Sequence, residues 1–287
     1  MGFLLNIEKI YQNLAKNQLK FLPHSPFSKI GMSTLLHKVR LKELSDLISD
    51  PDIKKSVEFY SKHHEELGDT QNIYKLMFTF QCLKQTEKLE GDIIELGTYK
   101  GGNTIMMAYY LKQIKSKKNI FGCDTFNGIP DPDEFVRNEL GQGLFSNTSL
   151  DSVSQKVKKF KMDDKIDLIQ GKFQDSLSKI QDSKFSLIFL DCCIYSAAKF
   201  GIEFAYPRLV NDGVMISQCY GVRKPSDNND LGVSPWGETT AVDEFLKDKI
   251  ENVMIDSMPY IQKCRERPNI TNSMPKDQFS TYSNQLK

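Results

Sequence analysis

From Gly91 onward the chain alternates short apolar segments with helix-forming segments, and this alternation restricts the fold more than any other feature. Strands are expected at 93–96, 119–123, 166–169, 185–190 and 214–216, and helices at 105–114, 152–160, 176–180, 197–209 and 240–246. Such alternation predicts a parallel sheet covered by helices on both faces. The last apolar segments, 252–255 and 260–264, are separated by only about four residues, too few for a parallel crossover, so they predict an antiparallel pair. The expected fold is a Rossmann-like α/β sandwich with a seven-stranded, mostly parallel sheet.

Residues 1–90 differ in character from the rest and read as helices throughout. The clearest helix of this region carries Ile73, Leu76, Phe80 and Leu83 on one apolar face. Another helix is expected after Pro51, a residue that suits the first turn. We therefore predict an N-terminal helical region at 1–90 that serves as a cap or an oligomerisation surface. An α/β domain follows at 91–265, with a polar tail at 266–287.

Composition excludes several classes of protein. The 38 basic and 37 acidic residues leave a formal charge of +1, which argues against a nucleic-acid binder. No apolar run approaches the ~18–20 residues that span a bilayer, so we expect no membrane association. The six scattered cysteines favour reduced thiols and a cytoplasmic protein.

The segment from Glu95 to Gly102 is the most informative motif, because it lies where the first strand turns into the first long helix. It reads Glu-Leu-Gly-Thr-Tyr-Lys-Gly-Gly. A dinucleotide fold would have G-x-G-x-x-G at this place, and Tyr99 occupies its second glycine position. An ordinary tight turn would explain the glycines but leaves the acid Glu95 unexplained.

Asp124 ends the second predicted strand and is a candidate for binding the two hydroxyls of a ribose, because a carboxylate offers several acceptor sites. A solvated aspartate is the alternative. Ligands of open parallel sheets lie beyond the carboxyl ends of the strands, where Asp124, Gly171 and Asp191 are expected to meet. Gln170 and Phe173 are candidates for an adenine pocket.

The glycine segment resembles the first motif of class I methyltransferases, whose cofactor is S-adenosylmethionine. Further segments resemble the macrocin O-methyltransferase (TylF-type) family, in the right order from about Gly91 to Leu246. They are 124–130, 171–176, 206–209, 212–216 and 241–245. The resemblance implies methylation of a sugar hydroxyl, generally on a natural-product glycoside, helped by a divalent metal such as magnesium. The cofactor-binding residues it implies, together with the strand-end argument, are Glu95, Gly97, Thr98, Tyr99, Gly101, Asp124, Thr125, Gln170, Gly171, Phe173 and Asp191.

The chain departs from this family at the active-site motifs Leu-Asp-x-Asp-x-Tyr-x-Ser-Thr and Asp-Asp-Tyr-Gly. Asp191 matches the first metal-binding acid, but Cys193 replaces the second acid, and Gln218 with Cys219 replaces the paired acids. Magnesium prefers hard oxygen ligands, so we expect catalysis without it, with Asp191 as base. Cys193, the second catalytic candidate, would act only as a thiolate.

Other groups could serve at the same place. Zinc bound by Asp191, Cys193 and Cys219 is chemically permitted, although buried cysteines are more often small core residues. Asp227, Asp230 or Glu238 could replace the missing carboxylates, with solvent exposure as the default expectation. Trp236 could stack on a sugar or anchor its loop.

The function expected is an S-adenosylmethionine-dependent O-methyltransferase that acts on a saccharide or a glycosylated small molecule without magnesium. The alternative is a catalytically degenerate protein that binds S-adenosylmethionine or S-adenosylhomocysteine and serves as a scaffold or partner subunit. Family members tend to be oligomeric through their helical parts, so a homo-oligomer is expected by analogy.

Overall fold

A computed structural model of the chain describes residues 45–68, 72–130, 143–192, 194–221, 237–255 and 258–264. The α-helices are α3 (Pro51–Leu67), α4 (Ile73–Thr86), α5 (Gly102–Gln113), α6 (Leu150–Lys159), α7 (Phe173–Ser176), α8 (Tyr195–Ala205) and α9 (Gly237–Leu246). The strands are β1 (Asp92–Leu96), β2 (Ile120–Asp124), β3 (Ile166–Gln170), β4 (Phe185–Leu190), β5 (Leu209–Ser217), β6 (Met254–Ile255) and β7 (Pro259–Gln262). Two short 3₁₀ helices, η1 (Leu177–Ile180) and η2 (Tyr206–Arg208), follow α7 and α8.

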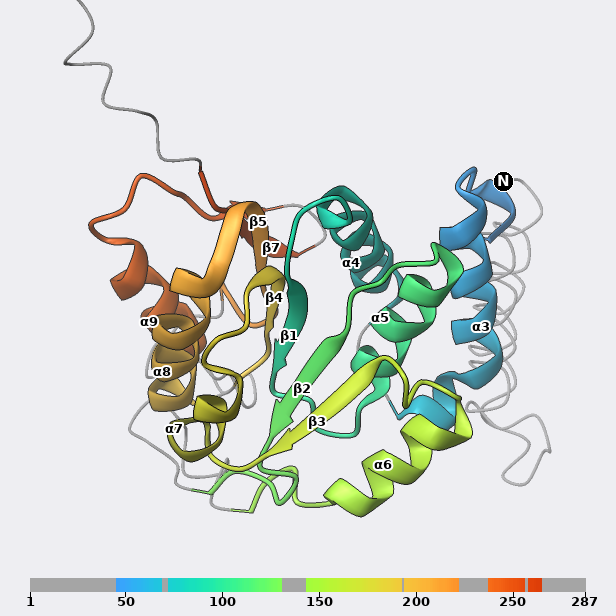
Figure 1. Ribbon diagram of the computed structural model, residues 1–287, viewed down its shortest axis with the longest axis horizontal. Coiled ribbons are helices and arrows are strands. Elements are labelled where there is room, and N and C mark those ends of the chain that lie inside the picture. The colour runs from blue at the N-terminus through green and yellow to red at the C-terminus, as the bar shows by residue number, and fades with distance from the viewer. Residues whose placement is uncertain are drawn as a thin grey trace, which may run out of the picture. The chain divides into compact units, whose positions relative to one another are not determined.

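The strands of the described residues form one seven-stranded sheet in the order β3-β2-β1-β4-β5-β7-β6 (Figure 1). The first five strands pair in parallel, and β7 runs antiparallel to both β5 and β6. The predicted fold class is therefore confirmed, including the antiparallel pair at the end of the sheet. The order reverses between β1 and β4, which is where open α/β sheets bind their ligands.

Strand β5 is longer than the sequence predicted, and the helix expected to reach residue 209 ends earlier. Leu209 pairs with Phe185 of β4, and the register then shifts before Leu187 pairs with Val214. Asp212 lies in this irregular stretch with φ 66°, and its backbone N–H donates to the carbonyl of Lys263 at 2.9 Å. The sequence predicts a strand only at 214–216, and hydrogen bonds of Asp212 and Gly213 with Lys263 extend it toward Leu209.

Helices cover both faces of the sheet, as the alternation predicted. Figure 1 shows α4, α5 and α6 on one side and α7, α8 and α9 on the other. Strand β4 is buried at every position, because it has helices on both faces and strands on both edges. The end of β4 is therefore anchored in the buried core.

The chain divides into two compact units, residues 1–62 and 63–287, and helix α4 belongs to the second unit together with the sheet. This division falls before the change of pattern at Gly91, where we predict that the α/β domain begins. Helix α3 begins at Pro51 as expected, and the Asp50 side chain caps it by accepting from the backbone N–H groups of Asp52 and Ile53. Within the described ranges no helix has the length and hydropathy needed to cross a membrane. The helix predicted near the N-terminus and the tail at 266–287 lie outside the described residues.

Candidate functional site

The carboxyl ends of five parallel strands meet at one edge of the sheet. Leu96 lies beside Cys123 and Leu190, and Leu190 lies beside Ser217. Asp124 lies beside Gln170 at the end of the β2–β3 pair. The residues predicted for the site follow these positions directly, so the topology brings their turns together.

The turn after β1 is tight because Gly97 packs directly against the turn after β4. Gly97 has φ +104°, and a Cβ built on it would lie 2.0 Å from the carbonyl oxygen of Asp191. Its backbone N–H donates to the carbonyl of Cys123 at 2.9 Å. Only glycine fits this place, so the turn holds the ends of β1, β2 and β4 in a fixed arrangement.

Glu95 anchors this turn from inside the protein. Its side chain is 1% exposed and accepts hydrogen bonds from Asn103 Nδ2 at 2.7 Å, from Thr98 Oγ1 at 3.3 Å and from the Thr104 hydroxyl. These partners belong to the turn and to the first residues of α5. The carboxylate therefore fixes the start of α5 against β1, and it does not line the pocket described below.

Asp124, at the end of β2, holds the turn that follows this strand and lines the pocket described below. One carboxylate oxygen accepts from the backbone N–H of Tyr99 at 2.8 Å, and the other accepts from the backbone N–H of Phe126 at 2.8 Å. Tyr99 has φ 50°, which aims its N–H at the acid. The Asp124 carboxylate thus engages the backbone N–H of the glycine turn, and the residue also lines this pocket. This arrangement suits a ribose diol better than a phosphate.

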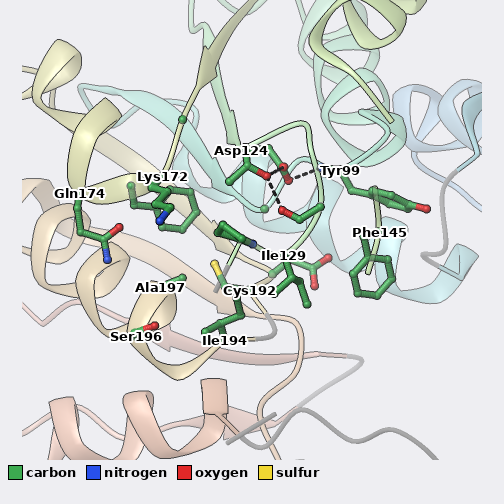
Figure 2. Close-up of a pocket in the computed structure, with 17 residues that line it drawn as sticks. Tyr99, Asp124, Ile129, Phe145, Lys172, Gln174, Cys192, Ile194, Ser196 and Ala197 are labelled. Carbon is green, nitrogen blue, oxygen red and sulfur yellow. Dashed lines mark hydrogen bonds between the residues drawn. The ribbon is translucent and has the colours of Figure 1, made fainter. Parts of the chain in front are cut away.

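A pocket opens above these turns, with mostly apolar walls and a few polar groups (Figure 2). In Figure 2 Tyr99 and Phe145 form one side, with their rings edge to face at 5.3 Å, and Lys172 and Gln174 form the opposite side. Ile194, Ser196 and Ala197, from the start of α8 and the residue before it, close the pocket below. Its apolar walls suit a flat base, and the Asp124 carboxylate suits a diol, so the pocket matches the two halves of a nucleoside.

The structure brings most of the predicted cofactor residues to this pocket. Those that line it are Gly97, Tyr99, Asp124, Thr125, Gly171, Phe173 and Asp191. Glu95, Thr98, Gly101 and Gln170 do not line it. Gln170 instead donates from Nε2 to the carbonyl of Thr125 at 3.3 Å and links the turns after β3 and β2. Cys193 lies outside the described residues.

Sequence reasoning missed the apolar walls. Ile129 and Phe145 reach the pocket from the segments after β2, and Ile194 reaches it from the segment after β4. Their position downstream of the strand ends was the available signal. Their inward direction depends on tertiary contacts, such as the backbone hydrogen bond from Ile129 to the carbonyl of Leu144 at 2.8 Å.

Glu238 lies fully buried at the same edge, so the default expectation of solvent exposure is wrong. Its carboxylate accepts from the backbone N–H groups of Cys192 and Cys219, each at 2.9 Å, and from Ser217 Oγ at 2.6 Å. Burial, and then the nearby Asp191 carboxylate, raise the pKa of Glu238 to about 8. Helix α9 thus inserts one acidic side chain between the ends of β4 and β5. Asp227, Asp230 and Trp236 lie outside the described residues.

The side chains around Asp191 do not suit magnesium. The oxygen of the Gln218 amide accepts from Lys75 Nζ at 2.9 Å, and the Cys219 thiol donates to Asp191 Oδ1 at 3.7 Å. Both oxygens of Glu238 already accept from protein donors. Magnesium needs an octahedral set of hard oxygens, but here the Gln218 oxygen is bonded to an ammonium group, the Asp191 carboxylate contacts a thiol, and the Glu238 carboxylate is bonded to protein donors. In the part of the chain that the structure describes, no three His, Cys, Asp or Glu side chains gather as a metal site.

Comparisons with protein-family models and with curated proteins both find relatives of this chain. The model of the Macrocin-O-methyltransferase (TylF) family matches residues 72–230. An 8-demethyl-8-(2,3-dimethoxy-alpha-L-rhamnosyl)-tetracenomycin-C 4'-O-methyltransferase from Streptomyces olivaceus is 25% identical over 141 residues, 46% of this chain and 54% of the relative. A Mycinamicin III 3''-O-methyltransferase from Micromonospora griseorubida is 26% identical over 140 residues, 45% of this chain and 55% of the relative. The chain spans about half the length of these curated relatives.

Solved structures show the same fold. The O-methyltransferase NovP has a TM-score of 0.58 at 22% identity, over 68% of this chain and 81% of that protein. The calicheamicin methyltransferase CalS11 has a TM-score of 0.56 at 17% identity, over 83% of this chain and 94% of that protein. At these identities the similarity establishes a shared architecture.

Proposed function

Because the chain belongs to the macrocin O-methyltransferase (TylF) family, we propose that it transfers a methyl group from S-adenosylmethionine to a hydroxyl of a saccharide or a glycosylated small molecule. We propose further that it does so without magnesium. The observation that carries the cofactor half of this proposal is the position of Asp124, bonded to the N–H of Tyr99 and facing a pocket with apolar walls.

Each cofactor residue has a distinct proposed role. Asp124, with Thr125 beside it, binds the ribose hydroxyls, and Phe173 and Gly171 contact the adenine. Gly97 and Tyr99 let the backbone of the turn approach the amino-acid end of the cofactor. Four residues do not contact the cofactor and instead hold the turns that carry these groups: Glu95, Thr98, Gly101 and Gln170.

Asp191 is the proposed base. It follows β4 directly, lines the pocket and accepts a hydrogen bond from the Cys219 thiol, and we propose that the acceptor binds here. When bound, S-adenosylmethionine supplies a methyl group whose carbon–sulfur bond breaks, with the electron pair left on sulfur, as the acceptor oxygen bonds to that carbon. Asp191 takes the proton of the acceptor hydroxyl, a role that contributes roughly 10²–10⁴-fold in rate. A catalytic role for Cys193 stays a prediction.

The printed names of the relatives support the acceptor class. The tetracenomycin relative is a 4'-O-methyltransferase of a rhamnosyl compound, and another curated relative is a Demethyldecarbamoylnovobiocin O-methyltransferase. These names motivate a rhamnose-containing glycoside as the first acceptor to test. Assembly into a homo-oligomer and a cytoplasmic location also stay predictions.

The alternative is a protein that binds the cofactor without turnover. It is supported by Gln218 and Cys219, which stand where the family has paired acids, while the cofactor pocket is retained. Radiolabelled methyl transfer to a panel of rhamnosides, including TDP-rhamnose, separates the two proposals. We expect labelled product in the presence of EDTA and no increase when magnesium is added. Binding of S-adenosylhomocysteine without any labelled product would favour the alternative, and product that requires magnesium would overturn the metal-free part.

A further inference from the structure

Lys75 places a positive charge beside Gln218, the residue that follows β5. It belongs to α4, which packs against β4 and β5, and its side chain is half-buried. Its Nζ donates to the side-chain oxygen of Gln218 at 2.9 Å, across 143 residues of sequence. The ammonium group is therefore held over the end of β5 by a specific partner.

This ammonium group lies close to the turn that carries Asp191. The backbone N–H of Gln218 donates to the carbonyl of Leu190 at 2.9 Å, so Gln218 lies beside the residue that precedes Asp191. The next residue, Cys219, contacts the Asp191 carboxylate through its thiol. Lys75 and Asp191 thus contact two consecutive residues after β5, Gln218 and Cys219, and of these two charged groups Asp191 also lines the pocket.

The amide of Gln218 explains why a lysine can remain there. An amide oxygen is neutral and accepts a hydrogen bond from the ammonium group without cancelling its charge, whereas an aspartate at this position would form an ion pair. The positive charge stays available to a second oxygen. A hydroxyl group that loses its proton has the chemistry to use it.

We propose that Lys75 takes the place of a divalent cation in this protein: its ammonium group, oriented by Gln218, binds the acceptor hydroxyl and stabilises the negative charge that develops as the proton passes to Asp191. This inference rests on the proposed methyltransferase function and adds a catalytic residue to it. The proton leaves the acceptor oxygen for the carboxylate, and the ammonium group keeps its own protons throughout. Gln218 acts as a positioning residue for Lys75.

The first experiment measures methyl transfer and cofactor binding in Lys75→Met, with Lys84→Met, an exposed lysine of the same helix, as the control. Loss of one group that stabilises a developing oxyanion lowers kcat by roughly 10²–10³-fold. We expect this loss in Lys75→Met, an S-adenosylhomocysteine affinity within about twofold of the wild type, and partial recovery of kcat in Lys75→Arg, which keeps the charge. A kcat in Lys75→Met equal to that of Lys84→Met would overturn the inference.

The second experiment does not depend on turnover. Electron paramagnetic resonance measures Mn²⁺ binding to the wild type, to Gln218→Asp/Cys219→Asp and to the same double variant with Lys75→Met. We expect no binding by the wild type and binding by the triple variant, because carboxylate oxygens suit such ions. The double variant should bind at least about tenfold more weakly than the triple variant, since the ammonium repels the metal. Equal affinities of the double and triple variants, or tight binding by the wild type, would contradict the inference.

The two proposals fail in different ways. If the wild type binds S-adenosylhomocysteine and methylates a rhamnoside but Lys75→Met is unaffected, only the role of Lys75 is wrong. If the wild type binds no S-adenosylhomocysteine, the proposed function is wrong, and the role of Lys75 that rests on it is lost as well.

Discussion

Asp124 and Glu238 are two carboxylates at one edge of the sheet with different surroundings. Asp124 is half-buried, and each of its oxygens accepts from one backbone N–H while the pocket remains open to it. Glu238 is 0% exposed and is enclosed by three donors from the ends of β4 and β5. The sequence predicts Asp124, because the end of a parallel strand is a defined place. It does not predict the inward direction of Glu238, which depends on how α9 packs.

Glu238 makes stability depend on pH. Its pKa in the folded protein, about 8, exceeds the ordinary value of 4.5, so the folded state binds more protons than the unfolded state between these values. Its stabilising contribution is complete below pH 4.5 and is lost as the pH rises through about 8, with a slope of up to about 1.4 kcal/mol per pH unit. Denaturant unfolding of the wild type should therefore show a steeper loss of stability from pH 6 to pH 8, roughly, than unfolding of Glu238→Gln.

The control for this prediction is Glu244→Gln on the same helix. Glu244 is exposed, and hydrogen bonds from Tyr195 and Lys199 lower its pKa. Both of its protonation equilibria therefore lie below the tested range, and this variant should keep the wild-type slope. Parallel curves for the wild type and Glu238→Gln would show that Glu238 is ionised throughout.

At the scale of elements, the turn after β1 connects three strands. Replacing Gly97 with Ala adds a Cβ to a residue with φ +104° and places it against the Asp191 carbonyl. Backbone strain and overpacking together predict a loss of about 3–5 kcal/mol. Gly143→Ala is the matched control, because its φ is +85° but no atom of the described residues lies within 4 Å of an added Cβ. It should lose only about 1–2 kcal/mol. Equal losses in thermal unfolding would show that the contact with Asp191 is unimportant.

The elements themselves were largely predictable, since strands buried in a parallel sheet are mostly apolar and alternate with helices along the chain. The first half of β5 was not, because residues 211–213 are not apolar, and hydrogen bonds between Lys263, which follows β7, and Asp212 and Gly213 hold this stretch beside the sheet. The part of the pocket formed by residues at the strand ends was predictable. Its far walls, such as Phe145, and the approach of Lys75 to Gln218 needed the tertiary structure.

At the scale of the whole molecule, a ligand that binds only the folded state raises its stability. S-adenosylhomocysteine at about 100 times its Kd should add about 2.7 kcal/mol, which corresponds to roughly 5–10 °C in Tm for a unit of this size. NAD at the same concentration should leave Tm unchanged, because Tyr99 replaces the second glycine of the dinucleotide motif and its N–H is occupied by Asp124. A larger shift with NAD would favour a nicotinamide-dependent enzyme.

The most direct measurement is a calorimetric titration of S-adenosylhomocysteine into the wild type, Asp124→Ala and Asp167→Ala, the last an exposed aspartate on β3. Loss of charge-assisted hydrogen bonds to the ribose predicts a Kd about 10–100-fold weaker for Asp124→Ala. Asp167→Ala should bind as the wild type does. A wild type that binds none, or an Asp124→Ala variant with unchanged affinity, would contradict the assignment of this pocket to an adenosyl cofactor.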